Sequence, residues 1–392
     1  MMKVVFVVAL VSCTAKAKSG GDKGGSWGGG SWSKKCDEIG QWREVDLGDD
    51  GPPFRASAPA VAVGSKIYYH GGESGGLQID GTPEIVYDDL WKLNTRTEEM
   101  SQLFPTGDVP PPTMGHSLVE YDGSLIVFGG FSNLNRDGFV TEGHTSYDRL
   151  YSLDLDSLEW RLVLPQLPWP QKRGEHGTAV VGKYMYIFGG FDFLNVTEDG
   201  TSVETGLKDE LWRYDMELSE WTELAKGPAA KWSMSFTAVG NTTLHLMFGA
   251  CAEGSNSEVG GDCNDNWVYD IDADEWTLLD ETTGAPSGRR SSPQTGNDVD
   301  GVVYWYGGAA PAFGNFFDDF IAFDTTTNTY FELFPNFNRG PKPPFTAGAT
   351  LTATTDKDDL FLFGGRAGSA AGFGLGGLWA YTPFPVYNAP EE

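Results

Sequence analysis

Short stretches of alternating apolar and polar residues, each ended by glycine or aspartate, recur along most of the chain. The segment from Tyr184 to Trp221 shows the unit clearly: YMYIFGG is followed by a long polar loop, then DELWRYD, then ELSEW. A two-residue period bounded by Gly and Asp turns predicts β-strands. The unit therefore predicts a group of short strands joined by tight turns and one long loop.

The apolar run that ends in glycine occurs six times, at 66–72, 124–130, 184–190, 244–250, 302–308 and 360–365. Its glycines are Gly71 and Gly72, Gly129 and Gly130, Gly189 and Gly190, Gly249, Gly307 and Gly308, and Gly364 and Gly365. Successive first glycines are 58, 60, 60, 58 and 57 residues apart. A period this regular over most of a chain predicts a repeat architecture.

A second phrase accompanies each copy, and a third follows in five of them. A large apolar residue occupies one register and a turn residue follows three positions later, as in Trp212 and Asp215. The third phrase, typified by SEWTEL at 219–224, is missing from the last repeat, but QWREVDL at 41–47 matches it at the other end of the chain. We therefore predict that the N-terminal strand closes the last repeat as its outermost strand, which removes open sheet edges.

These double glycines, spaced Trp residues and aspartates resemble the kelch repeat family, within the galactose oxidase central-domain-like superfamily. The resemblance covers about residues 41–384. It implies an all-β fold, a six-bladed kelch β-propeller of four-stranded antiparallel blades. It implies little about activity, because propellers carry unrelated functions.

The remaining segments predict export. Residues 1–17 combine Lys3, the apolar run VVFVVALV and an A-x-A site, as in a secretory signal peptide; LVSC at 10–13 leaves a lipoprotein box as a minor alternative. Residues 18–40 form a Gly/Ser/Trp-rich linker, whose Trp27 and Trp32 are interpreted as part of a tether rather than a sugar or partner site. Residues 41–384 would be the propeller and 385–392 a C-terminal tail. No apolar run reaches the length of a membrane span.

Cysteine and sequon positions agree with a secreted glycoprotein. Cys251 and Cys263 lie in one loop, where a disulfide would contribute about 3 kcal/mol in an oxidising compartment; two thiols are the alternative. Cys36 is left over and is either a thiol or a link between chains. Asn195 and Asn241 head N-x-T triplets in predicted turns and are candidate glycosylation sites.

The formal net charge of −28 argues against nucleic acid and anionic membranes as partners. It agrees with solubility or with a basic partner. We expect the protein to be a monomer.

Strand parity predicts which face binds. The loop between the second and third strands of a blade lies on the same face as the connection to the next blade, and these loops are long here, whereas the opposite turns are tight. Rigid scaffolds carry recognition on such loops. The loops contain eight phenylalanines that either contact a partner or fold back over the blades: Phe131, Phe139, Phe191, Phe193, Phe313, Phe316, Phe317 and Phe373.

Polar residues at the starts of the first strands are the candidate binding residues near the channel mouth: Arg55, His116, Arg173, Glu175, His176, Trp232, Arg289 and Arg290, with Lys231 beside them. His116 and His176 share a repeat register, which favours a structural role over a catalytic pair. Arg55, Arg173 and Arg290 are expected to be less engaged, so that they could select an anionic group.

Enzymatic interpretations are weaker. A copper oxidase needs a Tyr–Cys crosslink and a ligand set that the sequence does not supply, and no Glu/Asp/His spacing typical of the iron-binding plant specifier proteins occurs. DIDADE at 270–275 alternates aspartates as calcium loops do, but its register is that of the repeat's turn. We expect no metal, no cofactor and no catalytic residues.

The sequence thus favours a secreted kelch-repeat binding module that recognises a protein or glycan partner through the long-loop face. The alternative is a carbohydrate-active propeller enzyme of the mutarotase kind, with Arg173, Glu175 and His176 at the channel mouth.

Overall fold

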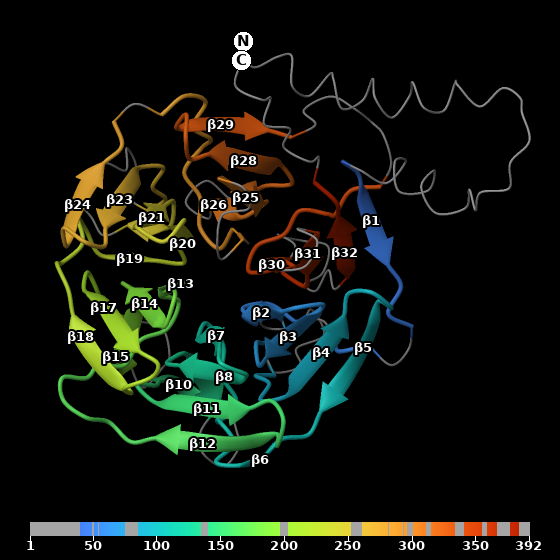
Figure 1. The fold of residues 1–392 in the computed structure, drawn as a ribbon, viewed down its shortest axis with the longest axis vertical. Coiled ribbons are helices and arrows are strands. Elements are labelled where there is room, and N and C mark those ends of the chain that lie inside the picture. Colours follow the sequence, from blue (N-terminus) through green and yellow to red (C-terminus); the bar gives the residue numbers. More distant parts are fainter. Residues whose placement is uncertain are drawn as a thin grey trace, which may run out of the picture.

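The computed structural model describes residues 40–48, 51–53, 55–74, 85–134, 140–196, 203–251, 261–280, 282–292, 294–295, 301–310, 315–333, 341–354, 359–366 and 377–383. These residues form strands, bridges and turns and contain no helix, and thus none long and apolar enough to cross a membrane. Six blades surround a central axis, which confirms the predicted six-bladed propeller (Figure 1). The proposed signal peptide, the linker with Trp27 and Trp32, Cys36 and the tail lie outside the described residues.

The blades follow one another along the chain. Blade 1 contains β2 (Ala60–Val63), β3 (Lys66–His70), β4 (Leu90–Asn94) and β5 (Glu99–Leu103). Blade 2 contains β7 (Ser117–Tyr121), β8 (Ser124–Phe128), β11 (Leu150–Asp154) and β12 (Glu159–Val163). Blade 3 contains β13 (Gly177–Val181), β14 (Tyr184–Phe188), β17 (Leu211–Asp215) and β18 (Glu220–Glu223).

The second half repeats this plan. Blade 4 contains β20 (Ser235–Val239), β21 (Thr243–Met247), β23 (Asn266–Asp270) and β24 (Glu275–Leu278). Blade 5 contains β25 (Val302–Tyr306), β28 (Phe320–Asp324) and β29 (Thr329–Glu332), and a bridge from Gln294 to Trp305 takes the innermost position. Blade 6 contains β30 (Thr350–Ala353), β31 (Leu360–Phe363), β32 (Leu378–Tyr381) and β1 (Trp42–Val45).

The N-terminal strand closes the last blade as predicted. β1 pairs antiparallel with β32, and Trp42 lies opposite Tyr381. The sixth blade is thereby built from both ends of the described chain, as the blue β1 beside the red β32 shows (Figure 1).

Additional short strands decorate the blades. β9 (Phe131–Leu134) with β10 (Val140–Ser146), and β15 (Phe191–Val196) with β16 (Val203–Leu207), form hairpins in the long loops. β19 (Lys231–Trp232) pairs with β22 (Ala250–Cys251), and β26 (Ala309–Ala310) with β27 (Asn315–Phe316). β6 (Thr106–Gly107), in the connection from blade 1, adds to blade 2 by pairing parallel with β12.

The hydrophobic core is divided among the six contacts between neighbouring blades. Each contact has its own cluster of buried side chains, for example Phe188 of blade 3 with Phe236 of blade 4. β1 takes part in two of them, since Trp42 packs against blade 5 and Val45 against blade 1. Burial of apolar area at every contact is what the alternating strands of the sequence provide.

A pair of glycines forms a tight corner at the end of the second strand in five blades, and Phe248 with Gly249 takes its place in blade 4. Gly129 and Gly130 have φ angles of +71° and +87°, which side-chain-bearing residues seldom adopt. A Cβ atom on Gly130 would also lie 2.8 Å from the Cβ of His116. The corner therefore requires glycine for its backbone conformation and for close packing against the start of the first strand.

The turns after the third strands are Asx turns. In blade 4 the Asp270 carboxylate accepts hydrogen bonds from the amides of Asp272 and Ala273 at 3.0 and 2.9 Å. Asp154, Asp215 and Asp324 do the same in their own blades. The structure therefore confirms that DIDADE is the repeat's turn.

Candidate functional site

Six residues that share one repeat register form a closed ring of backbone hydrogen bonds around the axis. They are Ser57, Gly115, Glu175, Ser233, Ser291 and Gly348, which we call the axial ring. Each amide donates to the carbonyl of the preceding blade, and the Ser57 amide donates to Gly348 to close the circle, over N···O distances of 2.7 to 3.1 Å. All six have φ between +50° and +68°, so one unusual conformation is repeated at six places.

A cavity of about 240 Å³ lies at the axial ring. All six ring residues line it, together with the residue that follows each of them and with Pro59, Gln294, Thr350 and Leu351. His116 and His176 belong to this lining, and the Nδ1 of His116 and both ring nitrogens of His176 have no partner among the described residues. A cavity of this size, with imidazole nitrogens and serine hydroxyls in its lining, suits hydrogen-bonding occupants.

The residues around the ring on the long-loop side form what we call the loop-side mouth. In each blade the residue after the double glycine pairs with the residue before the ring residue. The pairs are Glu73 with Ala56, Phe131 with Met114, Phe191 with Gly174, Ala250 with Trp232, Ala309 with Arg290, and Arg366 with Ala347. The backbone arrangement repeats, but no two blades carry the same pair of side chains.

One part of the mouth is apolar. Met114, Phe131 and Phe191 belong to one buried cluster, with Trp232 packed against it. The ring centroids of Phe131 and Phe191 are 5.5 Å apart, and those of Phe191 and Trp232 are 6.4 Å apart. We call these four residues the aromatic belt. Because Phe131 and Phe191 are buried, they fold over the blade ends and do not project into solvent.

The other part of the mouth is charged. Arg366 pairs with the buried Glu73, and the Arg290 Nε donates to the buried Asp262 at 2.5 Å. The Arg290 guanidinium also lies 5.6 Å from the ring centroid of Trp232, which joins the charged part to the aromatic belt.

Glu175 is the titratable member of the axial ring. Its carboxylate accepts a hydrogen bond from Ser233 Oγ, and its Cγ, like the Cε1 of Phe131, would lie about 3 Å from a Cβ atom on Gly115. Desolvation raises the pKa of Glu175, while Ser233, Arg366 and Arg290 oppose the rise and Glu73 adds to it. The carboxyl is therefore held in a poorly solvated position within the influence of both mouth arginines.

The basic residues two positions before the axial ring are structural. Arg289 donates to both oxygens of Asp319 at 2.7 and 2.9 Å and to the carbonyl of Gly307 at 3.0 Å. Arg55 makes the same contacts with Asp89 and Gly71. Arg173 with Glu210, and Lys231 with Asp265, complete the set, in which all four basic side chains are almost fully buried.

These contacts correct one expectation. Arg55, Arg173 and Arg290 do not present unengaged guanidinium groups: the first two are buried in ion pairs within their own blades, and Arg290 is held by Asp262. The repeats that lack the basic residue also lack the acid, since Thr113 is matched by Arg149 and Thr346 by Gly377. A binding role for these arginines stays a prediction, but selection of an anion by unpaired cations is not available to them.

His116 and His176 pack against the double-glycine corners. Each imidazole lies near the first glycine of the preceding blade: the Cε1 atoms of His116 and His176 would be 3.0 and 3.1 Å from a Cβ on Gly71 and Gly129. His116 Nε2 is also 2.9 Å from His70 Nδ1. Burial lowers the pKa of His176 to about 3 and that of His70 to about 4. This geometry agrees with the structural role that their shared register predicted.

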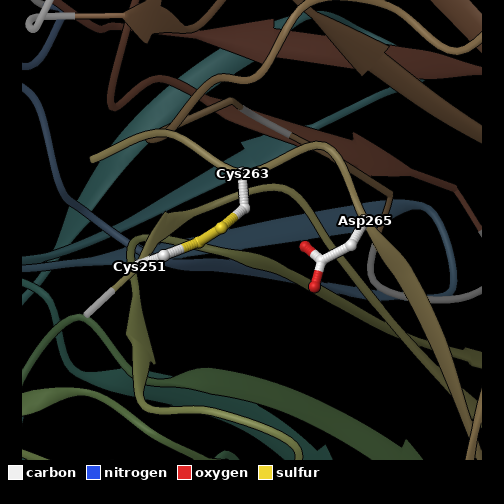
Figure 2. Close-up of side chains that lie close together, drawn as sticks. All are labelled: Cys251, Cys263 and Asp265. Atoms are coloured by element: carbon white, nitrogen blue, oxygen red, sulfur yellow. A yellow bond between two sulfur atoms is a disulfide. The ribbon is translucent and has the colours of Figure 1, made fainter. Parts of the chain in front are cut away.

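Cys251 and Cys263 are joined by a disulfide, with their Cα atoms 6.0 Å apart, and Asp265 lies beside them (Figure 2). Two sulfurs and a carboxylate in proximity could suggest a metal site. Here the sulfurs are bonded to each other, and the Asp265 oxygens accept from Lys231 and from Trp267 Nε1. The cluster thus anchors the base of the loop that presents Asp262 to Arg290.

Of the residues named from the sequence, Glu175, Trp232 and Arg290 lie at the ring or the mouth, while other residues there were missed. Sequence reasoning did not identify the axial ring, the acids Glu73 and Asp262, or Arg366. Comparing the position two residues after each basic residue across the six repeats would have found the ring, since only Glu175 departs there from Ser and Gly.

Comparisons with known proteins agree with this architecture. The model of the KLHDC2/KLHL20/DRC7 Kelch-repeats domain matches residues 20–190, 60–226 and 200–365. The chain is similar to Kelch domain-containing protein 3 of Bos taurus, with 27% identity over 82% of this chain and 80% of that protein, and to the Homo sapiens protein at 27% over the same shares. It is also 31% identical to the leucine-zipper-like transcriptional regulator 1 homolog of Drosophila melanogaster over 41% of this chain and 15% of that protein. The chain belongs to the kelch-repeat family that the KLHDC2/KLHL20/DRC7 domain describes.

Proposed function

We propose that this propeller is a protein-binding scaffold that holds a segment of a partner protein at the loop-side mouth. One observation carries the proposal: the backbone hydrogen bonds of the framework repeat from blade to blade, whereas no two blades carry the same pair of side chains at the mouth. Positions that serve the same structural role in every blade build the fold. Positions whose residues vary between blades are where recognition is expected.

The chemistry of the mouth suits a peptide segment. At the mouth, the partly buried Trp232 offers apolar area beside two ion pairs and a cavity lined by polar and apolar groups, the usual combination at protein-recognition sites. Aromatic residues and arginine are the side chains that most often dominate binding energy at such sites.

A secretory location is part of the proposal. It is supported by the apolar run at 4–11 and by the paired Cys251 and Cys263, since disulfides persist in oxidising compartments. A glycan partner would need the same aromatic surface and is tested in the same way. The carbohydrate-active alternative loses one of its three groups, because Arg173 is held by Glu210 and Gly189.

The test uses a phage-displayed library of random linear peptides and a glycan array, both probed with the purified chain. We expect peptides that bind the parent protein and lose about tenfold or more in affinity to Phe191→Ala/Trp232→Ala. The control is Phe104→Ala/Leu167→Ala, which removes two side chains that are 76% and 91% exposed. Peptides indifferent to the mouth double variant, or ligands found only on the glycan array, would overturn the proposal.

A further inference from the structure

Glu175 has a side chain that the fold does not need. Its ring contacts are made by its amide to Gly115 and by its carbonyl from Ser233, as in every other blade. Blades 1, 4 and 5 place serine at this position and blades 2 and 6 place glycine, with the same hydrogen bonds. The carboxylate is therefore an addition to the framework at one of six equivalent positions.

The charges around Glu175 leave one negative charge without a cation of its own. Glu73 is paired with Arg366, and Asp262 with Arg290. Within the part of the chain that the structure describes, Glu175 accepts a hydrogen bond from the neutral Ser233 hydroxyl, and the two arginines act on it only through space. Among the described residues, three carboxylates and two guanidinium groups thus give this side of the mouth a surplus of one negative charge.

The surroundings of Glu175 indicate which kind of cation fits beside it. The Cγ of Glu175 and the Cε1 of Phe131 would lie 3.1 and 3.0 Å from a Cβ atom on Gly115, Phe131 contacts Phe191, and the ring residues line the cavity. His116, only 6% exposed, lines the same cavity with an Nδ1 that has no partner among the described residues. An apolar wall beside a carboxylate matches a long aliphatic stem that ends in a cation, as in lysine and arginine.

We propose that Glu175 selects a basic residue, arginine or lysine, of the partner segment held at the loop-side mouth. This inference rests on the proposed function and names the chemistry of its partner. The stem of the basic side chain packs against Trp232, the partly buried member of the aromatic belt, and its head donates to the Glu175 carboxylate as a charge-assisted hydrogen bond. The net charge of −28 favours the approach of basic segments at low salt.

The experiment starts from the peptides selected by the parent protein, without any assumption about their sequence. The inference expects arginine or lysine at one fixed position in most of them, and about tenfold or greater loss of affinity when that residue is changed to glutamine. Glu175→Ser should cause the same loss and is safe for folding, because three other blades carry serine there. Glu175→Gln removes the charge with nearly constant shape.

The matched control is Glu275→Gln, which removes an exposed carboxylate on outer strand β24 and leaves the net charge equal to that of Glu175→Gln. A double-mutant cycle between Glu175→Gln and the peptide's basic-to-glutamine change should show that the two effects are not additive. Additive effects would mean that the two groups do not meet, and would overturn the inference.

The two proposals fail in different ways. Selected peptides that lose affinity to Phe191→Ala/Trp232→Ala but lack a basic residue, or bind Glu175→Ser as tightly as the parent, refute the selection by Glu175 and leave the scaffold proposal standing. Peptides that ignore the Phe191 and Trp232 changes refute both.

Discussion

The backbone amide of Ser57 in blade 1 donates a 2.7 Å hydrogen bond to the carbonyl of Gly348 in blade 6. This single contact joins residues 291 positions apart in the sequence and completes the axial ring. On the outside of the propeller, β1 performs the same closure by pairing with β32. Because of the inner and outer closures, the first and last blades depend on each other for their stability.

Trp42 should therefore be critical for folding. Its ring packs against Tyr306, Phe320 and Tyr381 at centroid distances of 5.1 to 5.4 Å. Trp42→Ala should lower the free energy of unfolding by about 3–5 kcal/mol, as measured by urea denaturation. Phe104→Ala, at a 76% exposed position, is the control and should change it little. A loss below about 1 kcal/mol for Trp42→Ala would show that β1 is not needed for closure.

The buried ion pair of Arg289 and Asp319 should behave as one unit. Arg289→Thr leaves the Asp319 carboxylate without its partner and should cost about 3–5 kcal/mol of unfolding free energy. Arg289→Thr/Asp319→Gly copies the Thr346 and Gly377 combination of blade 6 and should recover part of that loss. A double variant that is less stable than Arg289→Thr alone would contradict this account.

Acid should destabilise the fold through the buried histidines. The folded-state pKa of His176 is about 3, below its ordinary value of 6.5, mainly because burial disfavours the charged imidazole. Below pH 6.5 the unfolded chain therefore binds a proton at His176 that the folded chain does not bind. The free energy of unfolding is consequently highest above pH 6.5 and falls as the pH decreases toward 3.

His176→Met tests this effect, because blade 4 carries Met234 in the same register. It should reduce the slope of unfolding free energy against pH between 6 and 4 by about 1.4 kcal/mol per pH unit, the contribution of one proton. An unchanged slope, measured by urea denaturation at several pH values, would show that His176 is protonated in the folded protein.

Glu175 should act in the opposite direction. Its pKa is raised in the folded state, chiefly by desolvation, so its cost to stability is absent in acid and appears as the pH rises above the ordinary value of 4.5. Glu175→Gln should therefore raise the melting temperature at pH 7 and leave it almost unchanged at pH 4. A lower melting temperature at pH 7 would mean that the carboxylate stabilises the fold, contrary to its proposed role in binding.

Export through a eukaryotic secretory pathway should attach a glycan at Asn241, which lies exposed in the tight turn between β20 and β21. Peptide N-glycosidase should shift the mobility of the secreted chain, and Asn241→Gln should remove that part of the shift. Asn195, whose side chain lies outside the described residues, is the second acceptor to test. A chain that remains inside cells without a glycan would refute the secretory proposal.

The sequence by itself determined the repeat, the number of blades, the glycine corners, the Asx turns and the closing strand. These features follow from local rules: a two-residue alternation, residues that accept positive φ, and a phrase displaced from one end of the chain to the other. Similar local patterns appear in all six copies, so they can be read without knowing which residues meet in space.

Only the tertiary structure decided what the candidate site consists of. Arg55 and Arg173 looked available in the sequence, but they are buried against acids 34 and 37 residues away. Conversely, Glu73 meets Arg366 across 293 residues. Which charges are paired, and that Glu175 is not, depends on how the blades close around the axis, and no local pattern encodes that contact.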